Sequence, residues 1–339
     1  MAKRFHHDGL KKLVSMTFAS LGYSKEAGNA VASNLVLSNL KGMDSNGIRY
    51  LPRYVKSAVN GGMRIGGGQD VVVTGAESVV RVDARSLPGQ VVGPEAMRAG
   101  VEAARRHGVA VVATRNSHHL GRIGAWAEQA AEAGIASVHF TNVHGSDALV
   151  APHGVAPDAG GGHARLGTNP VCIGIPASSS MQAAAMDRGA REGELDASAI
   201  IVDFATSVTA LGNARNAANA GRELQAGALI DEKGDATNDP NVMFGAGGSQ
   251  DRGSGALLPA AEHKGFGLAL ACELLAGALC GGGHAASGTD EDVLRNSMLS
   301  FLVDPAALAA PGEEGYAQGA MDEILQHVRA AVRFCWPNG

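Results

Sequence analysis

The stretch 109–141, VAVVATRNSHHLGRIGAWAEQAAEAGIASVHFT, sets the architecture of the chain. Its first apolar run, 109–114, predicts a strand that leads into a polar loop over 115–119. Apolar residues at helical spacing follow over 123–133 and end at a glycine, and the run 135–141 predicts another strand. A strand, a loop, a helix and a strand in this order indicate an α/β protein.

The flanking sequence adds a helical start to this α/β core. Apolar residues recur at helical spacing over 8–42, interrupted by Gly22-Tyr23-Ser24 as a stop and an N-cap, and a third helix is predicted over 51–60. Paired strands are predicted at 71–74 and 79–82. We therefore divide the chain into an N-terminal helical segment (1–70), a central α/β region (71–310) and a C-terminal helix with its tail (311–339).

The later part of the chain alternates between loops and regular elements. The expected features are a Gly-rich connector (154–167), strands at 171–175 and 199–204, a polar excursion between them (178–198), a buried helix (266–279), a strand (297–303) and a terminal helix (321–332).

Composition excludes several classes of protein. The 339 residues carry 28 Lys+Arg against 33 Asp+Glu, a net charge of −5, so no basic surface for nucleic acid is expected. No apolar run approaches the roughly 20 residues that a membrane span needs. No signal peptide is evident, and the four cysteines are predicted to be reduced core thiols, so we expect a cytoplasmic protein.

The loop that contains His118 and His119 is the first candidate site, because loops at strand ends often hold functional groups in α/β proteins. A histidine there can move a proton near neutral pH, although a capping role explains it equally well. Metal binding is not expected, since no HExxH motif or spaced His/Cys/Asp cluster supplies three ligands.

The segment 41–54, KGMDSNGIRYLPRY, is the second candidate. Asp44 or Ser45 is expected to cap the following helix, and Arg49 and Arg53, four residues apart, are expected on one face. Two guanidinium groups on one face suit a carboxylate substrate, and a solvated helix face is the plain alternative.

Three further segments have the small, hydroxyl and charged residues that a nucleotide requires. They are 166–170 (LGTNP), 203–207 (DFATS) and 262–267 (EHKGFG). A Rossmann GxGxxG after a strand and a GxxxxGK[ST] P-loop are both missing, so any nucleotide site is of another design.

Together these segments resemble the type-2 malate/L-lactate dehydrogenase family, which includes ureidoglycolate, sulfolactate and diketogulonate oxidoreductases. The resemblance covers roughly 5–307, and the run 116–129 looks closest to hydroxycarboxylate dehydrogenase B within that family. The matching motifs are Asp44-Ser45-Asn46-Gly47, Asn116-Ser117-His118-His119, Phe140-Thr141-Asn142, 166–170, 203–207, Ala256-Leu257-Leu258-Pro259 and His263-Lys264-Gly265.

The resemblance implies NAD- or NADP-dependent interconversion of small 2-oxo and 2-hydroxy acids. It also implies a non-Rossmann cofactor-binding fold, a mixed sheet with the helical segment packed on it, and a homodimer. By position, His119 corresponds to the family's proton donor and acceptor, with Asn46 beside it and Arg49 or Arg53 on the substrate carboxylate. The positions that correspond to cofactor contacts or line that region are Asn142, Thr168, Asn169, Asp203, Phe204, Ala205 and Lys264.

Three departures from the family pattern stand out. Asn46 replaces the histidine of the usual Asp-Ser-His-Gly, and an amide donates hydrogen bonds but carries no titrating proton. Gly212-Asn213 stands where Gly-Lys is usual, and the chain diverges after Pro311. A catalytically impaired, cofactor-binding homologue with a structural or regulatory role is therefore the alternative to an active dehydrogenase.

Overall fold

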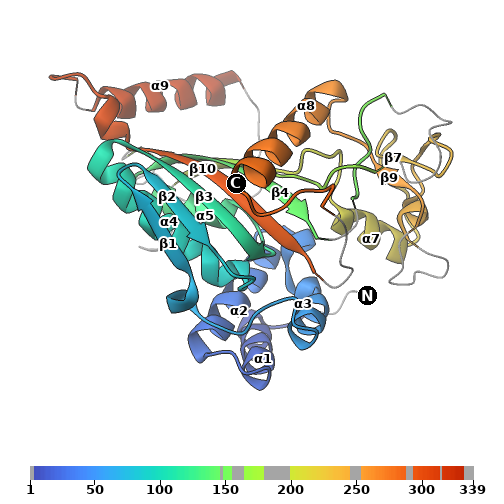
Figure 1. Cartoon of the computed structure of the whole chain (residues 1–339). Coiled ribbons are helices and arrows are strands. Elements are labelled where there is room, and N and C mark those ends of the chain that lie inside the picture. The colour runs from blue at the N-terminus through green and yellow to red at the C-terminus, as the bar shows by residue number, and fades with distance from the viewer. Residues whose placement is uncertain are drawn as a thin grey trace.

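A seven-stranded mixed sheet forms the centre of the molecule (Figure 1). The computed structural model describes residues 4–145, 148–154, 164–178, 199–244, 253–287, 293–313 and 315–331. The sheet order is β1-β2-β3-β10-β4-β5-β6, with β2 and β3 parallel and the other neighbours antiparallel. The strands are β1 Val72–Ala76, β2 Val79–Asp83, β3 Val109–His118, β10 Arg295–Val303, β4 Ala136–His144, β5 Val171–Pro176 and β6 Ala199–Phe204. The fold is mixed α/β, as predicted.

Strand β10 lies between β3 and β4, so the predicted strand–helix–strand unit is not a pair of neighbouring strands. The prediction of a loop over 115–119 was also wrong for most of its length. Ser117 and His118 pair with β10, and the His118 N–H donates to the Leu87 carbonyl at 3.0 Å. These partners extend β3 by four residues, and the strand places His119 at its end.

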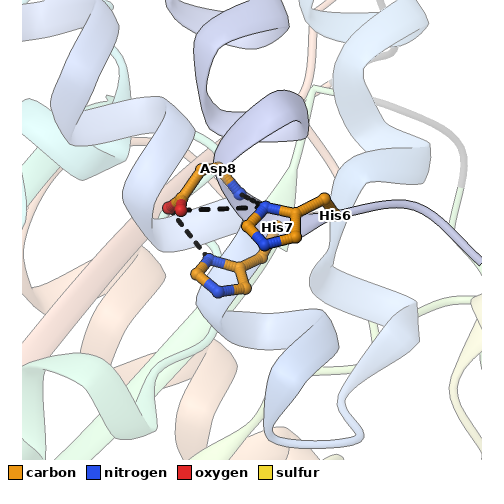
Figure 2. Close-up of side chains that lie close together, drawn as sticks. All are labelled: His6, His7 and Asp8. Carbon is orange, nitrogen blue, oxygen red and sulfur yellow. Dashed lines mark hydrogen bonds and ion pairs between the residues drawn. The ribbon is translucent and has the colours of Figure 1, made fainter.

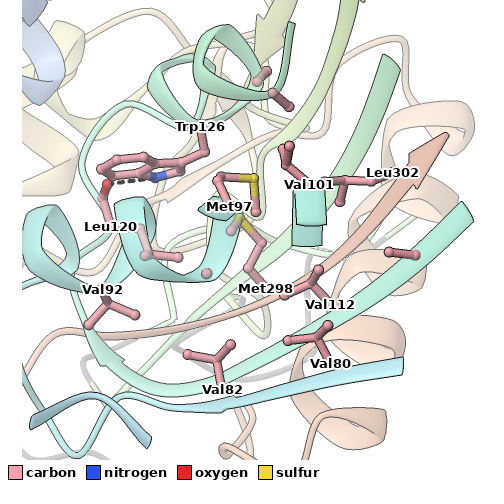
Figure 3. Packing of buried hydrophobic residues seen from close by; sticks show 14 of the residues in the cluster. Val80, Val82, Val92, Met97, Val101, Val112, Leu120, Trp126, Met298 and Leu302 are labelled. Atoms are coloured by element: carbon pink, nitrogen blue, oxygen red, sulfur yellow. Dashed lines mark hydrogen bonds between the residues drawn. The ribbon is translucent and has the colours of Figure 1, made fainter. Parts of the chain in front are cut away.

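Helices α4 (Gly89–His107) and α5 (Gly124–Glu132) cover one face of the sheet. Their small and apolar side chains interlock with inward-facing residues of β2, β3 and β10 in the main core (Figure 3). Trp126 lies at its edge, and its indole N–H donates to the Leu120 carbonyl at 3.2 Å. That bond fixes the turn that follows His119.

The N-terminal helices α1 (His7–Ser20), α2 (Lys25–Leu40) and α3 (Leu51–Val59) form a separate apolar core below the sheet in Figure 1. Ser24 caps α2 as predicted, since its hydroxyl accepts from the Ala27 N–H at 3.2 Å. Val91 of α4 joins this core and so ties the helical segment to the sheet layer. The domain boundaries drawn from the sequence remain a prediction.

A smaller sheet, in the order β8-β7-β9, forms a third packed region with its own core. Its elements, which lie to the right in Figure 1, include the short helices α7 and η5. Their bounds are β7 Leu229–Ile230, β8 Ala236–Thr237, β9 Ala256–Leu257, α7 Leu211–Asn219 and η5 Pro240–Met243. Short 3-10 turns η1, η2, η3 and η8 span Asp44–Asn46, Ile48–Tyr50, Gly68–Asp70 and Pro305–Leu308.

The apolar stretch 266–279 is not the buried helix that the sequence predicted. Helix α8 (His263–Cys272) continues as a π-helical segment, η7 (Glu273–Leu279), which packs on the sheet through one side only. Leu270, Leu274 and Leu279 on the other side are 40%, 54% and 74% exposed. The stretch is therefore apolar on its exposed side as well as on its buried side.

Of the remaining expectations, some are confirmed and others concern residues outside the described ranges. Helix α9 (Tyr316–Ala331) is the predicted terminal helix, and Cys172, Cys272 and Cys280 are free and buried. Cys335 and most of the connector and polar excursion lie outside the described residues. No helix in the described ranges is long and apolar enough to cross a membrane.

Candidate active site

His119 lies directly after β3 and is 8% exposed. Its Nδ1 lies 2.7 Å from the hydroxyl of Tyr54, which accepts a hydrogen bond from Gln90 Nε2 at 3.1 Å. The ring also stacks on Tyr50, with centroids 4.3 Å apart. Tyr54 of α3 and Tyr50 of η2 thus fix the orientation of this imidazole, and Gln90 of α4 holds Tyr54 in place.

The Tyr54 hydroxyl determines which ring nitrogen of His119 carries the proton. Because Gln90 donates to this oxygen, the hydroxyl proton is available for His119 Nδ1, and the proton of a neutral ring is then on Nε2. Burial raises the pKa of Tyr54, so this hydroxyl keeps its proton. The arrangement leaves Nε2 as the atom available to a ligand.

Charge around His119 favours the neutral ring. Burial and the nearby Arg53 guanidinium lower its pKa to about 3. The pKa of His118 is also lowered, first by burial and then by His119, and its Nε2 lies 3.1 Å from Ser57 Oγ. The charge of Arg53 therefore acts on both histidines, while His118 packs against α3.

The segment with Asn46 is built around Asn39 of α2. The Asn39 side chain donates to Asp44 at 2.5 Å and accepts from the Ile48 N–H at 2.8 Å. A Cβ on Gly47 would lie 2.2 Å from the same side chain, so only glycine fits there. This bond occupies Asp44, and neither Asp44 nor Ser45 caps the following helix as predicted. Asn46 is left half-exposed at the end of η1.

Arg49 and Arg53 have different surroundings, although the sequence placed them on one face. A Cβ on Gly212 would lie 2.3 Å from Arg49 Nη1, so Arg49 extends to the start of α7. Arg53 is half-buried and acts on the two histidines. The divergence arises because Arg49 lies in a 3-10 turn and Arg53 in α3.

Asn142 and Asn169 meet at a buried carboxylate. Asn142 Nδ2 donates to Glu273 Oε1 at 3.3 Å, and Asn169 Nδ2 donates to Oε2 at 2.8 Å. Their carbonyl oxygens accept from the backbone N–H groups of Ser297 and Val143, each at 3.0 Å. Both amides are fully buried and hold η7 against the sheet, and their part in cofactor binding stays a prediction.

The residues around the end of β6 have mixed exposure. Asp203 accepts from the Gly124 N–H at 2.7 Å, and burial raises its pKa. The Thr168 carbonyl accepts from both the N–H and the hydroxyl of Thr206 at 3.1 Å. Phe204 is 41% exposed and Ala205 is half-buried, so both offer surface to a ligand.

A buried ion cluster lies beside these residues. Arg122 binds both oxygens of Glu128, at 2.9 and 2.6 Å, and Lys41 reaches the same carboxylate at 2.8 Å. Arg122 and Glu128 are each less than a tenth exposed, and a Cβ on Gly124 would lie 2.5 Å from Arg122 Nη1. These charges link α2 to α5 below the end of β6.

Lys264 is exposed in the first turn of α8. The next residue, Gly265, is buried, and a Cβ there would lie 1.9 Å from the Ala260 carbonyl oxygen, which requires the close turn before the helix. Among the described residues, no hydrogen bond or ion pair occupies the Lys264 ammonium group. An exposed cation at a helix start fits a phosphate group.

Tyr54 and Gln90 were not assigned a role from the sequence. Tyr54 lies within the quoted 41–54 segment, and a tyrosine on an apolar helix face signals a buried hydroxyl that needs a partner. Gln90 has no comparable signal, because it precedes the region where the helical pattern was recognised, at 94, and α4 begins at Gly89.

Comparisons with known proteins identify the family of this chain. A family model described as malate/L-lactate dehydrogenase matches residues 5–334. Hydroxycarboxylate dehydrogenase B of Escherichia coli K12 is 36% identical over 311 residues, 91% of this chain and 78% of that protein. L-lactate dehydrogenase of Cupriavidus necator is 36% identical over 277 residues, 81% of this chain and 71% of its own length. A solved malate/lactate dehydrogenase-type structure from E. coli has a TM-score of 0.81 at 33% identity, covering 98% of this chain and 84% of that one.

Proposed function

The chain belongs to the malate/L-lactate dehydrogenase family, and on that basis we propose that His119 transfers the proton when it interconverts a 2-oxo acid and a 2-hydroxy acid. The observation that carries this proposal is the buried imidazole at the end of β3, held by Tyr54 and facing the charge of Arg53. A nicotinamide cofactor supplies the hydride when it is bound. Protein groups must then bind the acid, polarise its carbonyl and move one proton.

Arg53 is the group that we assign to the substrate carboxylate. It is half-buried, where a guanidinium binds a carboxylate more strongly than in open water. Pairing with the carboxylate would also offset the positive charge that lowers the pKa of His119. Binding of the acid therefore favours protonation of the ring, and His119 Nε2 can deliver a proton to the developing alkoxide. Arg49 adds positive charge on the side of α7.

Asn46 stands where the family pattern implies histidine, and we propose that it donates a hydrogen bond to the substrate oxygen. An amide donor polarises a carbonyl without changing its own protonation state. His119 then remains the residue that exchanges the proton. Under this division, the substitution lowers the rate without abolishing turnover.

The cofactor is proposed to be NAD or NADP, with Lys264 on a phosphate group. The exposed ammonium beside Gly265 supports this placement. Phe204 and Ala205 follow Asp203 directly in the sequence and offer surface to the cofactor. We assign Asp203, Thr168, Asn142 and Asn169 to the same cofactor site. No described residue distinguishes a ribose hydroxyl from a 2′-phosphate, so both forms belong in the test.

A homodimer in the cytoplasm completes the proposal. The exposed leucines 270, 274 and 279 on one side of α8 and η7 are the kind of apolar surface that a second copy covers. Free buried thiols are typical of a reducing compartment.

A substrate panel tests the proposed activity. Purified protein is assayed with pyruvate, oxaloacetate, phenylpyruvate, 3-sulfopyruvate and other 2-oxo acids, each with NADH and with NADPH, by absorbance at 340 nm. We expect turnover of at least one acid with one cofactor. A matched panel of simple ketones that lack the carboxylate should give at least tenfold lower kcat/KM, because Arg53 then has no partner. No turnover with any acid would support the catalytically impaired alternative.

A further inference from the structure

His153, Glu262 and His263 form a cluster that the proposed reaction does not use. Their ligand atoms, one from each residue, all lie within 4.8 Å of one another, and all three residues are exposed. The two imidazole ring centroids are 6.0 Å apart. Residues 109 positions apart in sequence are thus brought together on one surface, which is why motif spacing did not reveal them.

The fold holds both ligand-bearing segments close to the cluster. Two residues before His153, the Ala151 N–H donates to the Leu257 carbonyl at 2.9 Å. Two residues before Glu262, the Ala260 N–H donates to the Thr206 carbonyl at 2.8 Å. Anchored ligands lose little conformational freedom on binding, and this favours a site over a chance approach of surface side chains.

Two imidazoles and one carboxylate are the donor set of open zinc sites. Neutral imidazole nitrogen suits zinc, copper and nickel, while calcium and magnesium need mostly oxygen ligands. Ligand atoms around a tetrahedral zinc ion are about 3.4 Å apart at its usual bond lengths, so small side-chain rotations close this cluster. We propose that His153, Glu262 and His263 bind one divalent transition-metal cation of the zinc class.

A second cluster, His6, His7 and Asp8, is the competing site (Figure 2). His6 Nδ1 and His7 Nδ1 lie 3.7 and 3.0 Å from Asp8 oxygens, and His6 Nδ1 also accepts from the Asp8 N–H at 3.4 Å. These three residues are consecutive, so they can bind a metal without the fold. The His153 cluster, in contrast, exists only in the folded chain, and unfolding separates the two sites experimentally.

The cation would connect the segment after β4 to the start of α8. It would therefore raise the melting temperature, because it binds the folded chain and not the unfolded one. Lys264 follows His263 directly, so bound metal also adds positive charge next to the surface that we assign to a cofactor phosphate. The metal proposal stands independently of that assignment.

Calorimetric titration with Zn²⁺ tests the site. The protein carries no affinity tag and has His6→Ala and His7→Ala substitutions, which remove the competing cluster. We expect one Zn²⁺ per chain and a melting temperature that rises with Zn²⁺ concentration. His153→Ala should weaken binding at least about 100-fold, since loss of a ligand exceeds the 10- to 100-fold effect of losing an outer partner. Glu262→Gln should weaken it at least about tenfold on the same basis.

The control is His107→Ala, which removes an exposed histidine at the end of α4 and should leave Zn²⁺ affinity unchanged. Circular dichroism checks that each variant is folded. Co²⁺ provides a second readout, because coordination by two histidines and a carboxylate gives visible absorption that His153→Ala should remove. Zinc affinity that is absent from the starting protein, or that is the same in the His153→Ala and Glu262→Gln variants as in the starting protein, would overturn the proposal.

Discussion

Two buried polar clusters, one around Glu273 and one around His119, differ in how completely their atoms are paired. Around Glu273, each side-chain polar atom of the carboxylate and of its two asparagine partners has a protein hydrogen bond. Around His119, buried atoms of three residues have no hydrogen-bond partner in the described part of the chain. They are Asn34 Oδ1, Gln90 Oε1 and His118 Nδ1.

From this difference we infer that the Glu273 cluster supports the fold and that the His119 cluster binds a ligand. A buried polar atom without a partner costs about 1–3 kcal/mol, so folded proteins keep few of them. Thr141 Oγ1 and Ser297 Oγ, on residues that flank Asn142, also lack a partner among the described residues. The three atoms around His119 differ in lying beside the residue that we propose for proton transfer, where a bound ligand can pair them. In the Glu273 cluster, in contrast, every side-chain polar atom already has a protein partner, and these bonds hold η7 against the sheet.

The largest expected effect on stability is at the saturated cluster. Asn169→Ala removes the partners of the Val143 N–H and of Glu273 Oε2, and should lower the free energy of unfolding by about 3 kcal/mol. Its left-handed backbone, φ 32°, adds to the strain of alanine. Urea unfolding measures the loss. Exposed Asn219→Ala is the control, expected within about 0.5 kcal/mol of the parent, and a similarly small loss for Asn169→Ala would refute the structural assignment.

Acid sensitivity should come from buried neutral histidines. His139 lies between the hydroxyls of Ser300 and Ser137, and burial lowers its pKa to about 4. Because the unfolded chain binds this proton below about pH 6.5, the folded state loses up to roughly 1.4 kcal/mol per pH unit between pH 6.5 and 4. The stabilisation is fully present above that range. His139→Gln should reduce the slope by that amount.

Unfolding free energies at several pH values from 4.5 to 7 measure this slope. The exposed His107→Gln variant serves as the reference, since its histidine is not buried. An identical slope in the His139→Gln and His107→Gln variants would show that His139 is protonated normally in the folded protein.

A smaller effect, on kcat, is expected from the tyrosine that holds the His119 ring. Tyr54→Phe removes the hydroxyl beside His119 Nδ1 and should lower kcat about fivefold to tenfold, equivalent to about 1–1.4 kcal/mol, with KM little changed. The pH profile should shift as well, since the ring tautomer is no longer fixed. Tyr23→Phe is the matched control, because its hydroxyl is buried in the same N-terminal core but donates to the Met63 carbonyl and does not contact His119. Equal kcat in both variants would remove Tyr54 from the site.

Elements with strong local patterns were predictable from the sequence. The N-terminal helices, the Ser24 cap and the strands around 171–204 follow from apolar spacing and turn residues. The position of β10 between β3 and β4 was not predictable, since strand pairing across 180 residues has no local signal. The same pairing converted an expected loop into the end of β3.

The candidate site shows the same division. Motif order identified His119 and Arg53 as candidates, and the charge of Arg53 lowers the pKa of His119 in addition to burial. Spacing on an assumed helix failed for Arg49, because Arg49 lies in a 3-10 turn and α3, which holds Arg53, begins only at Leu51. Partners such as Gln90 and Glu273 depend on tertiary packing alone, so no sequence pattern could assign them.

The turnover of His119→Ala tests the central claim most directly. We expect kcat for reduction of the best 2-oxo acid to fall about 100-fold or more, while the Kd of the cofactor stays within about twofold. His139→Gln, a substitution of a buried histidine outside the site, should keep the parent kcat. Parental turnover in His119→Ala would contradict the account and leave the proton transfer to another residue.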